Sequence, residues 1–186
     1  MKRLALVASM VMVPGASLAS DVCDDLWFTR NLILDRNGYC FESPLGQAVF
    51  DNEGCTEAEP VLGGDDQYLI AYATWREEEL GCAVDTARTT LDVSQIELRR
   101  KVAELPLGTG TERACIGWRG GRVSLRAARD DISPLLGAIR TGDTILFRFD
   151  RIRGWSFVEV VQNGVGAGAG WAQITLLDES CEAVVG

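Results

Sequence analysis

The sequence predicts an α+β protein in which a small helical module, linked by disulfides, is followed by a small β-barrel. Two patterns along the 186 residues support this class. Helix start and stop signals dominate up to about residue 106, whereas short segments rich in β-branched and aromatic residues fill the rest. A hydrophobic content of 47% with five tryptophans suffices for a packed core and argues against disorder.

Residues 1–19 have the pattern of a secretory signal peptide. Lys2 and Arg3 form a basic start, and the apolar run of ten residues that follows is too short to cross a bilayer. We expect cleavage after Ala19, so that the mature chain begins at Ser20 and is periplasmic or secreted. A membrane anchor is the alternative, but after cleavage we expect no membrane insertion.

Residues 20–106 carry the signals of four helices. The first begins near Asp24 and stops at Asn37-Gly38, where glycine allows a left-handed turn. The second begins at Ser43-Pro44, with serine as the N-cap and proline in the first turn. The four expected helices cover about residues 24–36, 44–52, 66–80 and 94–105. The third has an apolar stripe at i, i+4 and i+7, formed by Tyr68, Tyr72 and Trp75.

The fourth helix has a defined start and stop. Ser94 and Glu97 form the Ser-x-x-Glu pattern of a capping box, and Pro106 ends the segment. The basic residues 99–101 fall in the last turns, where cations interact favourably with the helix dipole. We therefore interpret this basic run as a solvated helix end, with a basic docking patch as the alternative.

One face of the first helix mixes apolar and polar side chains, namely Trp27, Arg30, Asn31 and Leu34. If this face is buried, Arg30 and Asn31 need partners, because an unpaired buried charge is costly. We expect an internal hydrogen-bond clamp between the first two helices, made through Asp35 or a carbonyl after Gly38. A face that binds a partner is the alternative.

Residues 107–112 contain Gly108-Thr109-Gly110-Thr111 and have the composition of a linker. Beyond them, five or six short strands within about 65 residues favour a small barrel over residues 113–186. The glycine-rich run 164–170 is followed by a further expected strand rather than a helix, so we interpret it as a turn and not a nucleotide-binding loop. The expected strands lie near residues 115–119, 123–126, 136–139, 144–149 and 155–161.

Six cysteines follow the signal, and in an oxidising compartment an even number predicts three disulfides. No Cys-x-x-Cys pair is present, which argues against zinc or thioredoxin-like chemistry. Cys115 and Cys181 should pair, because they flank the barrel and the two ends of a closed barrel lie close together. In the helical module, a hairpin of the first two helices favours Cys23–Cys55 and leaves Cys40–Cys82.

Four motifs follow one another over residues 115–177: Val123-Ser124-Leu125-Arg126, Gly142-Asp143, Gly154-Trp155 and Gly170-Trp171. Their order resembles that of bacterial SH3-like domains. The resemblance implies an SH3-like β-barrel that binds a short peptide from the cell wall or from a partner protein. Ala127-Ala128 replaces the Ser-Gly-Pro that usually follows the arginine, so the loop beside the ligand groove is altered.

Two further motifs, Leu26-Trp27-Phe28-Thr29-Arg30-Asn31 and Gly38-Tyr39-Cys40-Phe41, lie in the N-terminal part. They resemble the YARHG module of exported bacterial proteins over residues 22–90. Together with Cys55 and the segment around Cys82, they resemble an uncharacterised family of exported proteins from Gram-negative bacteria. The resemblance implies an association with the cell envelope.

The composition excludes several functions. Without histidine, the chain has no Ser/His/Asp or Cys/His catalytic machinery and no histidine metal ligands. A net charge of −9 argues against nucleic-acid binding. We expect no metal, no cofactor and no catalysis. Adjacency alone does not make an acid/base pair of Asp24-Asp25, Asp65-Asp66 or Asp130-Asp131, but a carboxylate-based hydrolase stays an alternative.

These observations predict a non-catalytic binding protein of the cell envelope whose barrel binds a cell-wall or partner peptide. Trp155 and Trp171 are the candidate aromatic contacts of such a groove, although either could instead fill the core, and Arg126 is the candidate polar contact. Expected partners are a peptide, peptidoglycan or an envelope protein. An inhibitor or adaptor of an envelope enzyme, acting through an acidic surface, is the second hypothesis.

Overall fold

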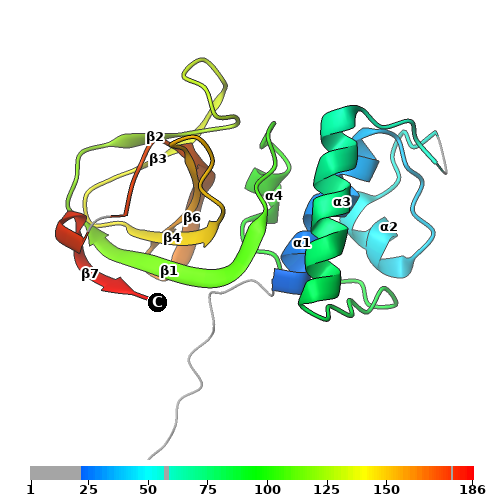
Figure 1. The fold of residues 1–186 in the computed structure, drawn as a ribbon, viewed down its shortest axis with the longest axis horizontal. Coiled ribbons are helices and arrows are strands. Elements are labelled where there is room, and N and C mark those ends of the chain that lie inside the picture. The colour runs from blue at the N-terminus through cyan, green and yellow to red at the C-terminus, as the bar shows by residue number, and fades with distance from the viewer. Residues whose placement is uncertain (1–21, 57–58, 177) are drawn as a thin grey trace, which may run out of the picture.

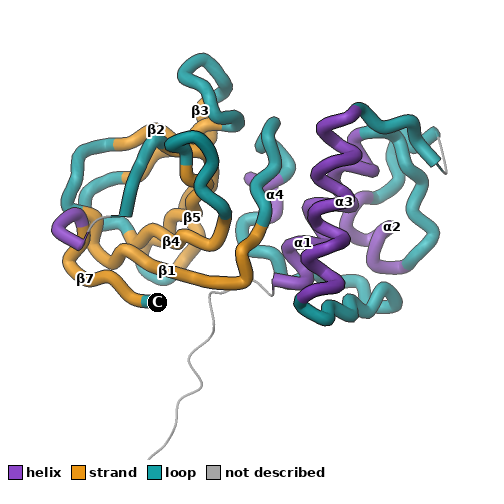
Figure 2. Tube along the Cα trace, viewed as in Figure 1, coloured by secondary structure: helices purple, strands orange, loops and turns teal. Residues whose placement is uncertain are grey.

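The computed structural model describes residues 22–56, 59–176 and 178–186. Three helices lie on one side of the molecule and a curved antiparallel sheet on the other, with a short helix between them (Figures 1 and 2). The predicted order of a helical part followed by a sheet is confirmed. The signal segment and its cleavage site lie outside the described residues. Within those residues, no helix has both the length and the apolar character needed to span a membrane.

The three N-terminal helices are α1 (Val22–Arg36), α2 (Pro44–Phe50) and α3 (Gly64–Glu79). Their local signals act as predicted. The Ser43 hydroxyl caps α2 by accepting a hydrogen bond from the Gly46 amide, and Pro44 occupies its first turn. Gly38, with φ of 83°, lies just beyond the end of α1, in a conformation that a side chain would strain.

Helices α1 and α3 pack side by side in antiparallel orientation. At one end of the pair, the Asn37 side chain donates a hydrogen bond to Asp66 Oδ2 over 3.1 Å. At the other end, Cys23 is bonded to Cys82, which follows α3. The two helices have 15 and 16 residues, so they match in length and can support each other along their whole course.

This pairing of α1 and α3 explains why two predicted disulfides are wrong. The helical part contains Cys23–Cys82 and Cys40–Cys55, not Cys23–Cys55 and Cys40–Cys82. The prediction paired α1 with α2, but α2 has only seven residues and α3 takes that place. Cys40 and Cys55 instead close the chain around α2. The predicted Cys115–Cys181 disulfide is confirmed.

The expected clamp on Arg30 exists, but it joins α1 to α3 rather than to α2. Arg30 Nε donates to Glu77 Oε2 over 3.1 Å, and a second guanidinium nitrogen lies 3.3 Å from the other carboxylate oxygen. Asn31 is satisfied within its own helix, because its amide donates to the Trp27 carbonyl. The polar side chains of this face therefore have structural partners.

The fourth predicted helix is much shorter than expected. Helix α4 spans only Ile96–Arg99, and it is preceded by Gln95 with φ of 50° rather than by a serine cap. The Ser94 hydroxyl lies 2.5 Å from Glu159 Oε1 in the sheet, so it does not form the predicted capping box. A tertiary contact has replaced a local one.

The sheet contains seven strands, and every pairing between them is antiparallel. Their order is β3-β2-β6-β5-β4-β1-β7, so β3 and β7 form the two edges and the sheet is not closed. It curves strongly around its interior (Figure 1). The strands are β1 (Gly108–Trp118), β2 (Val123–Arg126), β3 (Leu135–Ile139), β4 (Thr144–Phe149), β5 (Ser156–Gln162), β6 (Val165–Ala172) and β7 (Cys181–Val185).

Two predictions about glycine-rich segments need correction. Residues 108–111 are not a linker but the first part of β1, where Gly108 pairs with Phe149 of β4. In the run 164–170, only Gly164 belongs to a turn, and the remaining residues form β6. Glycine permits close approach of neighbouring elements in both places, which composition alone does not distinguish from flexibility.

The core consists mainly of two apolar clusters. One fills the interior of the curved sheet and includes Cys115, Leu125, Ile139, Ile145, Val158, Val160 and Ala172. The other lies at the junction of the helices and the sheet and includes Trp27, Phe28, Phe50, Val102, Phe149, Phe157 and Trp171. The junction cluster takes aromatic side chains from both parts of the molecule, so the two parts share one core.

Candidate functional site

The three predicted binding residues all have structural contacts. Trp171 is fully buried and its indole nitrogen donates to the Glu104 carbonyl over 2.6 Å. Trp155 is 9% exposed and packs in the junction cluster. Arg126 is half-buried and donates to the Ser133 carbonyl over 2.9 Å, which ties down the loop between β2 and β3. None of the three lines the two cavities described below.

The larger of two cavities in the described part of the chain is a groove of about 930 Å³ between the helices and the sheet. Its walls come from four places: the first half of α3 with the end of α1, the segment 103–107, Arg129 in the loop after β2, and the turn between β4 and β5. Because these segments are far apart in the sequence, the groove exists only when the helical part and the sheet are packed together. We call it the junction groove.

The helical wall of the junction groove is acidic and aromatic. Asp65 and Asp66 lie in the first turn of α3, where the helix dipole favours negative charge. Tyr68 and Tyr72 follow one and two turns later. The Tyr72 hydroxyl lies 3.4 Å from Asp150 Oδ2, across the groove. Burial raises the pKa of Tyr72, and the nearby Asp150 raises it further, so the phenol keeps its proton at neutral pH.

The aromatic stripe of α3 is therefore not a buried face, contrary to the usual outcome of such a pattern. Tyr68 is 66% exposed and Trp75 is 52% exposed. Helix α3 packs instead through the small side chain of Ala73, with Leu69 and Ile70 partly covered. Two exposed aromatic side chains on one helix are unusual for a residue class that normally fills cores. Tyr72, between them, is half-buried.

The opposite wall of the junction groove carries three arginines together with Glu104 and Asp150. Arg151 and Arg153 lie in the turn between β4 and β5, and both are exposed. Arg153 has φ of 49° and precedes Gly154 with φ of 88°, so a tight turn presents the two arginines. A third arginine on this wall, Arg129, lies 2.5 Å from the Glu104 carboxylate and covers the Trp171 ring at 5.2 Å.

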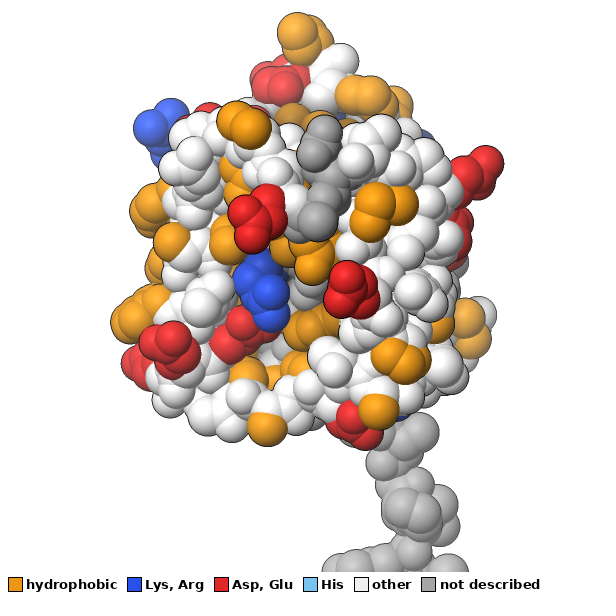
Figure 3. All heavy atoms as spheres, turned by 90° about the vertical axis from the view of Figure 1, so that its right-hand side faces the viewer, with side chains coloured by type: hydrophobic (Ala, Val, Ile, Leu, Met, Phe, Trp, Pro, Cys, Tyr) orange, Lys and Arg blue, Asp and Glu red, His pale blue; other side chains and the backbone are white. Residues whose placement is uncertain are grey.

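The face formed by the helices carries scattered acidic and apolar side chains and fewer basic ones (Figure 3). This distribution agrees with the net charge of −9. The junction groove, by contrast, is lined by both carboxylates and arginines. A lining with charges of both signs is complementary to a ligand that also carries both.

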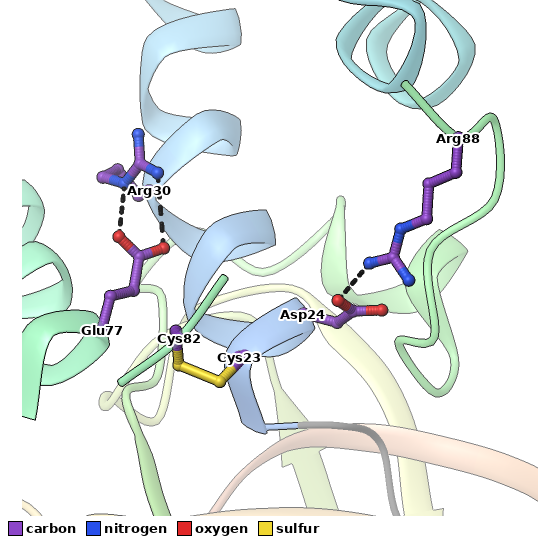
Figure 4. The surroundings of a disulfide bond; sticks show 6 residues. All are labelled: Cys23, Asp24, Arg30, Glu77, Cys82 and Arg88. Carbon is purple, nitrogen blue, oxygen red and sulfur yellow. Dashed lines mark hydrogen bonds and ion pairs between the residues drawn. A yellow bond between two sulfur atoms is a disulfide. The ribbon is translucent and has the colours of Figure 1, made fainter. Parts of the chain in front are cut away.

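A second feature of the junction is a set of buried ion pairs between α1 and the rest of the chain. Asp25 Oδ1 lies 2.5 Å from a guanidinium nitrogen of Arg99, which is fully buried. The Arg99 guanidinium also lies over the Phe149 ring at 4.9 Å. Asp24 pairs with Arg88, close to the Cys23–Cys82 bond (Figure 4). These ion pairs connect the start of α1 to the segment between α3 and β1.

The predicted role of the basic run 99–101 is therefore wrong for its first member. Arg99 is not a solvated cation at a helix end but the centre of the junction, enclosed by Asp25, Thr29 and three aromatic rings. No local signal distinguishes it from Arg100. Among the described residues, no group of three or more Asp, Glu or Cys side chains could hold a metal ion.

Comparison with known proteins gives two family matches. Residues 3–77 match the YARHG domain, which confirms the resemblance of the N-terminal module. Residues 81–186 match a domain of unknown function, DUF4453. No curated protein and no solved structure matches the chain. The YARHG domain and the three disulfides indicate an extracytoplasmic protein. Since the second match covers more than half of its length, the chain belongs to the DUF4453 family and carries an N-terminal YARHG domain.

Proposed function

We propose that this protein is a non-catalytic binding protein of the periplasm that holds an extended peptide in the junction groove. One observation carries the proposal: a single groove is lined by carboxylates and arginines, of which Asp65, Arg151 and Arg153 are exposed, and by two tyrosines of α3. A groove of about 930 Å³ accommodates several residues of a peptide. Peptide grooves of this kind commonly combine aromatic surfaces with a few charged contacts.

The charges of the groove favour a ligand with an ammonium group and a carboxylate. Asp65 is exposed on the acidic wall and is available to an ammonium group. Arg151 and Arg153 have no side-chain hydrogen bond or ion pair with any described residue, so both can bind a carboxylate. A stem peptide of the bacterial cell wall carries both groups. We therefore propose a cell-wall peptide as the ligand, and a charged segment of a partner protein as the other outcome of the test.

The proposal keeps the SH3-like relationship but moves the site. The strand order from β2 to β6 and the four sequence motifs support a sheet derived from an SH3-like barrel with open edges. The ligand would contact the turn between β4 and β5 at the end of this sheet, rather than Trp155 and Trp171. Both tryptophans are instead buried in the junction cluster.

A hydrolase that uses paired carboxylates has less support. Asp24 and Asp25 are buried, and each is held by an arginine. A carboxylate that is buried and engaged in an ion pair is not placed to reach a substrate as a general acid or base. An inhibitor or adaptor would also use an exposed surface, but it would bind a folded enzyme and not a short peptide, so the experiment below separates the two.

Isothermal titration of the mature protein with a purified tetrapeptide stem, containing a diamino acid, tests the proposal. We expect saturable binding, and at least about 10-fold weaker binding for the double variant Arg151→Glu/Arg153→Glu, because two attractive contacts become repulsive. The matched control is Arg113→Glu/Arg122→Glu, which changes the same charge on exposed residues outside the groove. Absence of binding by the wild type, or equal loss in both double variants, would overturn the proposal.

A further inference from the structure

A second, smaller cavity lies beside the first turn of α1 and is separate from the junction groove. It has a volume of about 180 Å³ and lies between α1, the start of β1 and the end of β4. Its polar lining comes from Asp25, Glu112 and Arg148, together with Thr111. Since none of its lining residues belongs to the junction groove, its chemistry can be considered independently of the proposed peptide site.

One oxygen of Asp25 has no partner among the described residues. The side chain is about 4% exposed, and Oδ1 is paired with Arg99. Oδ2 is also buried, but it accepts no hydrogen bond from the described part of the chain. A buried carboxylate oxygen without a donor is costly, because it has lost its water and gained no partner. The oxygen therefore requires a donor, and Asp25 lines the cavity.

The charges around the cavity call for a cation. Arg148 lies 2.5 Å from Glu112 and 3.1 Å from Glu159, and Arg99 pairs with Asp25. Of the side chains that line the cavity, Asp25 and Glu112 are carboxylates and Arg148 is the single guanidinium group. A ligand with one positive charge would balance this set, and a primary ammonium group would also supply the hydrogen-bond donor that Asp25 lacks.

Gly108 is the residue of β1 that packs directly against the unpartnered oxygen, with no side chain of its own. A Cβ atom at this position would lie 3.3 Å from Asp25 Oδ2 and 3.7 Å from a methyl group of Val22. A side chain here would therefore cover the oxygen and narrow the cavity. The position does not require glycine for its backbone, because its φ is outside the left-handed region. Glycine at residue 108 thus leaves Asp25 open to the cavity.

We propose that the cavity formed by Asp25, Gly108 and Glu112 is a binding site for a small primary ammonium group. The bound group donates to Asp25 Oδ2 and lies near the Glu112 carboxylate. A volume of about 180 Å³ has room for a small alkylammonium ion but not for a peptide. This site would remain even if the junction groove binds no peptide.

The test is an NMR titration of the ¹⁵N-labelled mature protein with methylammonium chloride. We expect saturable shifts of the amides of Gly108, Gly110 and Thr111. Tetramethylammonium has the same charge but no N–H donor and should give no saturable shift at these amides. The variant Gly108→Ala should bind methylammonium at least about 10-fold more weakly, whereas the control Gly121→Ala, where a Cβ meets nothing within 4 Å, should bind as the wild type.

A second variant keeps the test decisive if Gly108→Ala does not fold. Glu112→Gln removes one negative charge from a partly exposed side chain and should also weaken methylammonium binding. Three results would each overturn the proposal: no saturable shift in the wild type, equal shifts with tetramethylammonium, or unchanged affinity in both cavity variants.

Discussion

The interior of the sheet and the junction of the helices with the sheet are built on different chemistry. The sheet interior is an apolar cluster that includes the buried half-cystines Cys115 and Cys181. The junction cluster is aromatic but encloses the ion pair of Asp25 and Arg99. An apolar core tolerates small shifts, whereas a buried ion pair must be matched in position to offset its desolvation. The comparison teaches that the sheet interior provides stability and that the junction specifies how the two parts dock.

The junction also combines the two matched families. Phe28 and Asp25 belong to the YARHG match, whereas Arg99, Phe157 and Trp171 belong to the DUF4453 match. Neither part would cover its aromatic face alone. The junction groove depends on the same packing, so under the proposed function peptide binding would depend on the docking of the two parts.

The largest expected effect breaks the junction. Replacing Arg99 by Met should lower the free energy of unfolding by about 3–5 kcal/mol, because Asp25 is left buried and unpaired. The double variant Asp25→Asn/Arg99→Met should recover part of the loss. Urea denaturation followed by tryptophan fluorescence measures both changes, with the exposed neighbour Lys101→Met as the control. A loss below 1 kcal/mol for Arg99→Met would show that the ion pair does not organise the junction.

The next effect compares disulfides of the two regions. Cys115 and Cys181 are 66 residues apart, whereas Cys40 and Cys55 are 15 apart. In the chain-entropy model, replacing the first pair by alanine should cost about 4 kcal/mol and the second about 3 kcal/mol. Denaturation midpoints of the two double variants test this order. If the pair around α2 proved the more costly one, the sheet interior would not be the main source of stability.

The next prediction concerns how stability depends on pH through Glu159, a residue of β5 that is 1% exposed. Its carboxylate accepts a hydrogen bond from Ser94, in the segment before α4, and so connects the sheet with the junction. Burial raises the pKa of Glu159, although Arg148, the Ser94 hydroxyl and Arg99 act to lower it, and Asp25 adds to the increase. The folded state therefore binds the proton more tightly than the unfolded state. Stability from this group is present below its unfolded pKa and is lost as pH rises through the folded pKa.

The variant Glu159→Gln should remove that dependence. The melting temperature of the variant minus that of the wild type should increase as the pH is raised from about 4 to about 7, since glutamine has no charge to desolvate. Thermal unfolding monitored by circular dichroism at several pH values gives this difference. If the difference instead fell with rising pH, the pairing of Glu159 with Arg148 would outweigh burial.

The smallest expected effect on stability concerns the exposed stripe of α3. Replacing Tyr68 by Ala should change the free energy of unfolding by no more than about 0.5 kcal/mol, because Tyr68 is 66% exposed. Under the proposed function, the same change should weaken peptide binding. Urea denaturation of Tyr68→Ala gives the change in the free energy of unfolding, and peptide titration of the same variant gives the change in affinity. A large loss of stability would mean that the stripe is structural.

The sequence predicted what depends on local signals. The cap of α2 and the stop of α1 follow from Ser43 and Gly38, which act on their own neighbours. Most strand positions follow from local runs of β-branched and aromatic residues. The Cys115–Cys181 disulfide also followed, because it required only that the ends of the sheet domain meet. These features needed no knowledge of how the helical part packs.

The features that depend on long-range packing could not be predicted. Ser94 bonds to Glu159, 65 residues away, so its capping pattern had no effect. Arg99 looks like its basic neighbours until Asp25 is placed beside it, 74 residues away. The junction groove combines α3 with a turn near residue 151, and no sequence motif spans that distance.

The central claim, that a peptide binds in the junction groove, is tested most directly by mapping amide shifts of the ¹⁵N-labelled mature protein as the cell-wall stem peptide is added. The claim predicts saturable changes at Asp65, Tyr68 and Tyr72 on α3 and at Arg151 and Arg153 in the β4–β5 turn, all with one affinity. No saturable changes at all, or changes confined to the loop between β2 and β3 around Arg126, would contradict it.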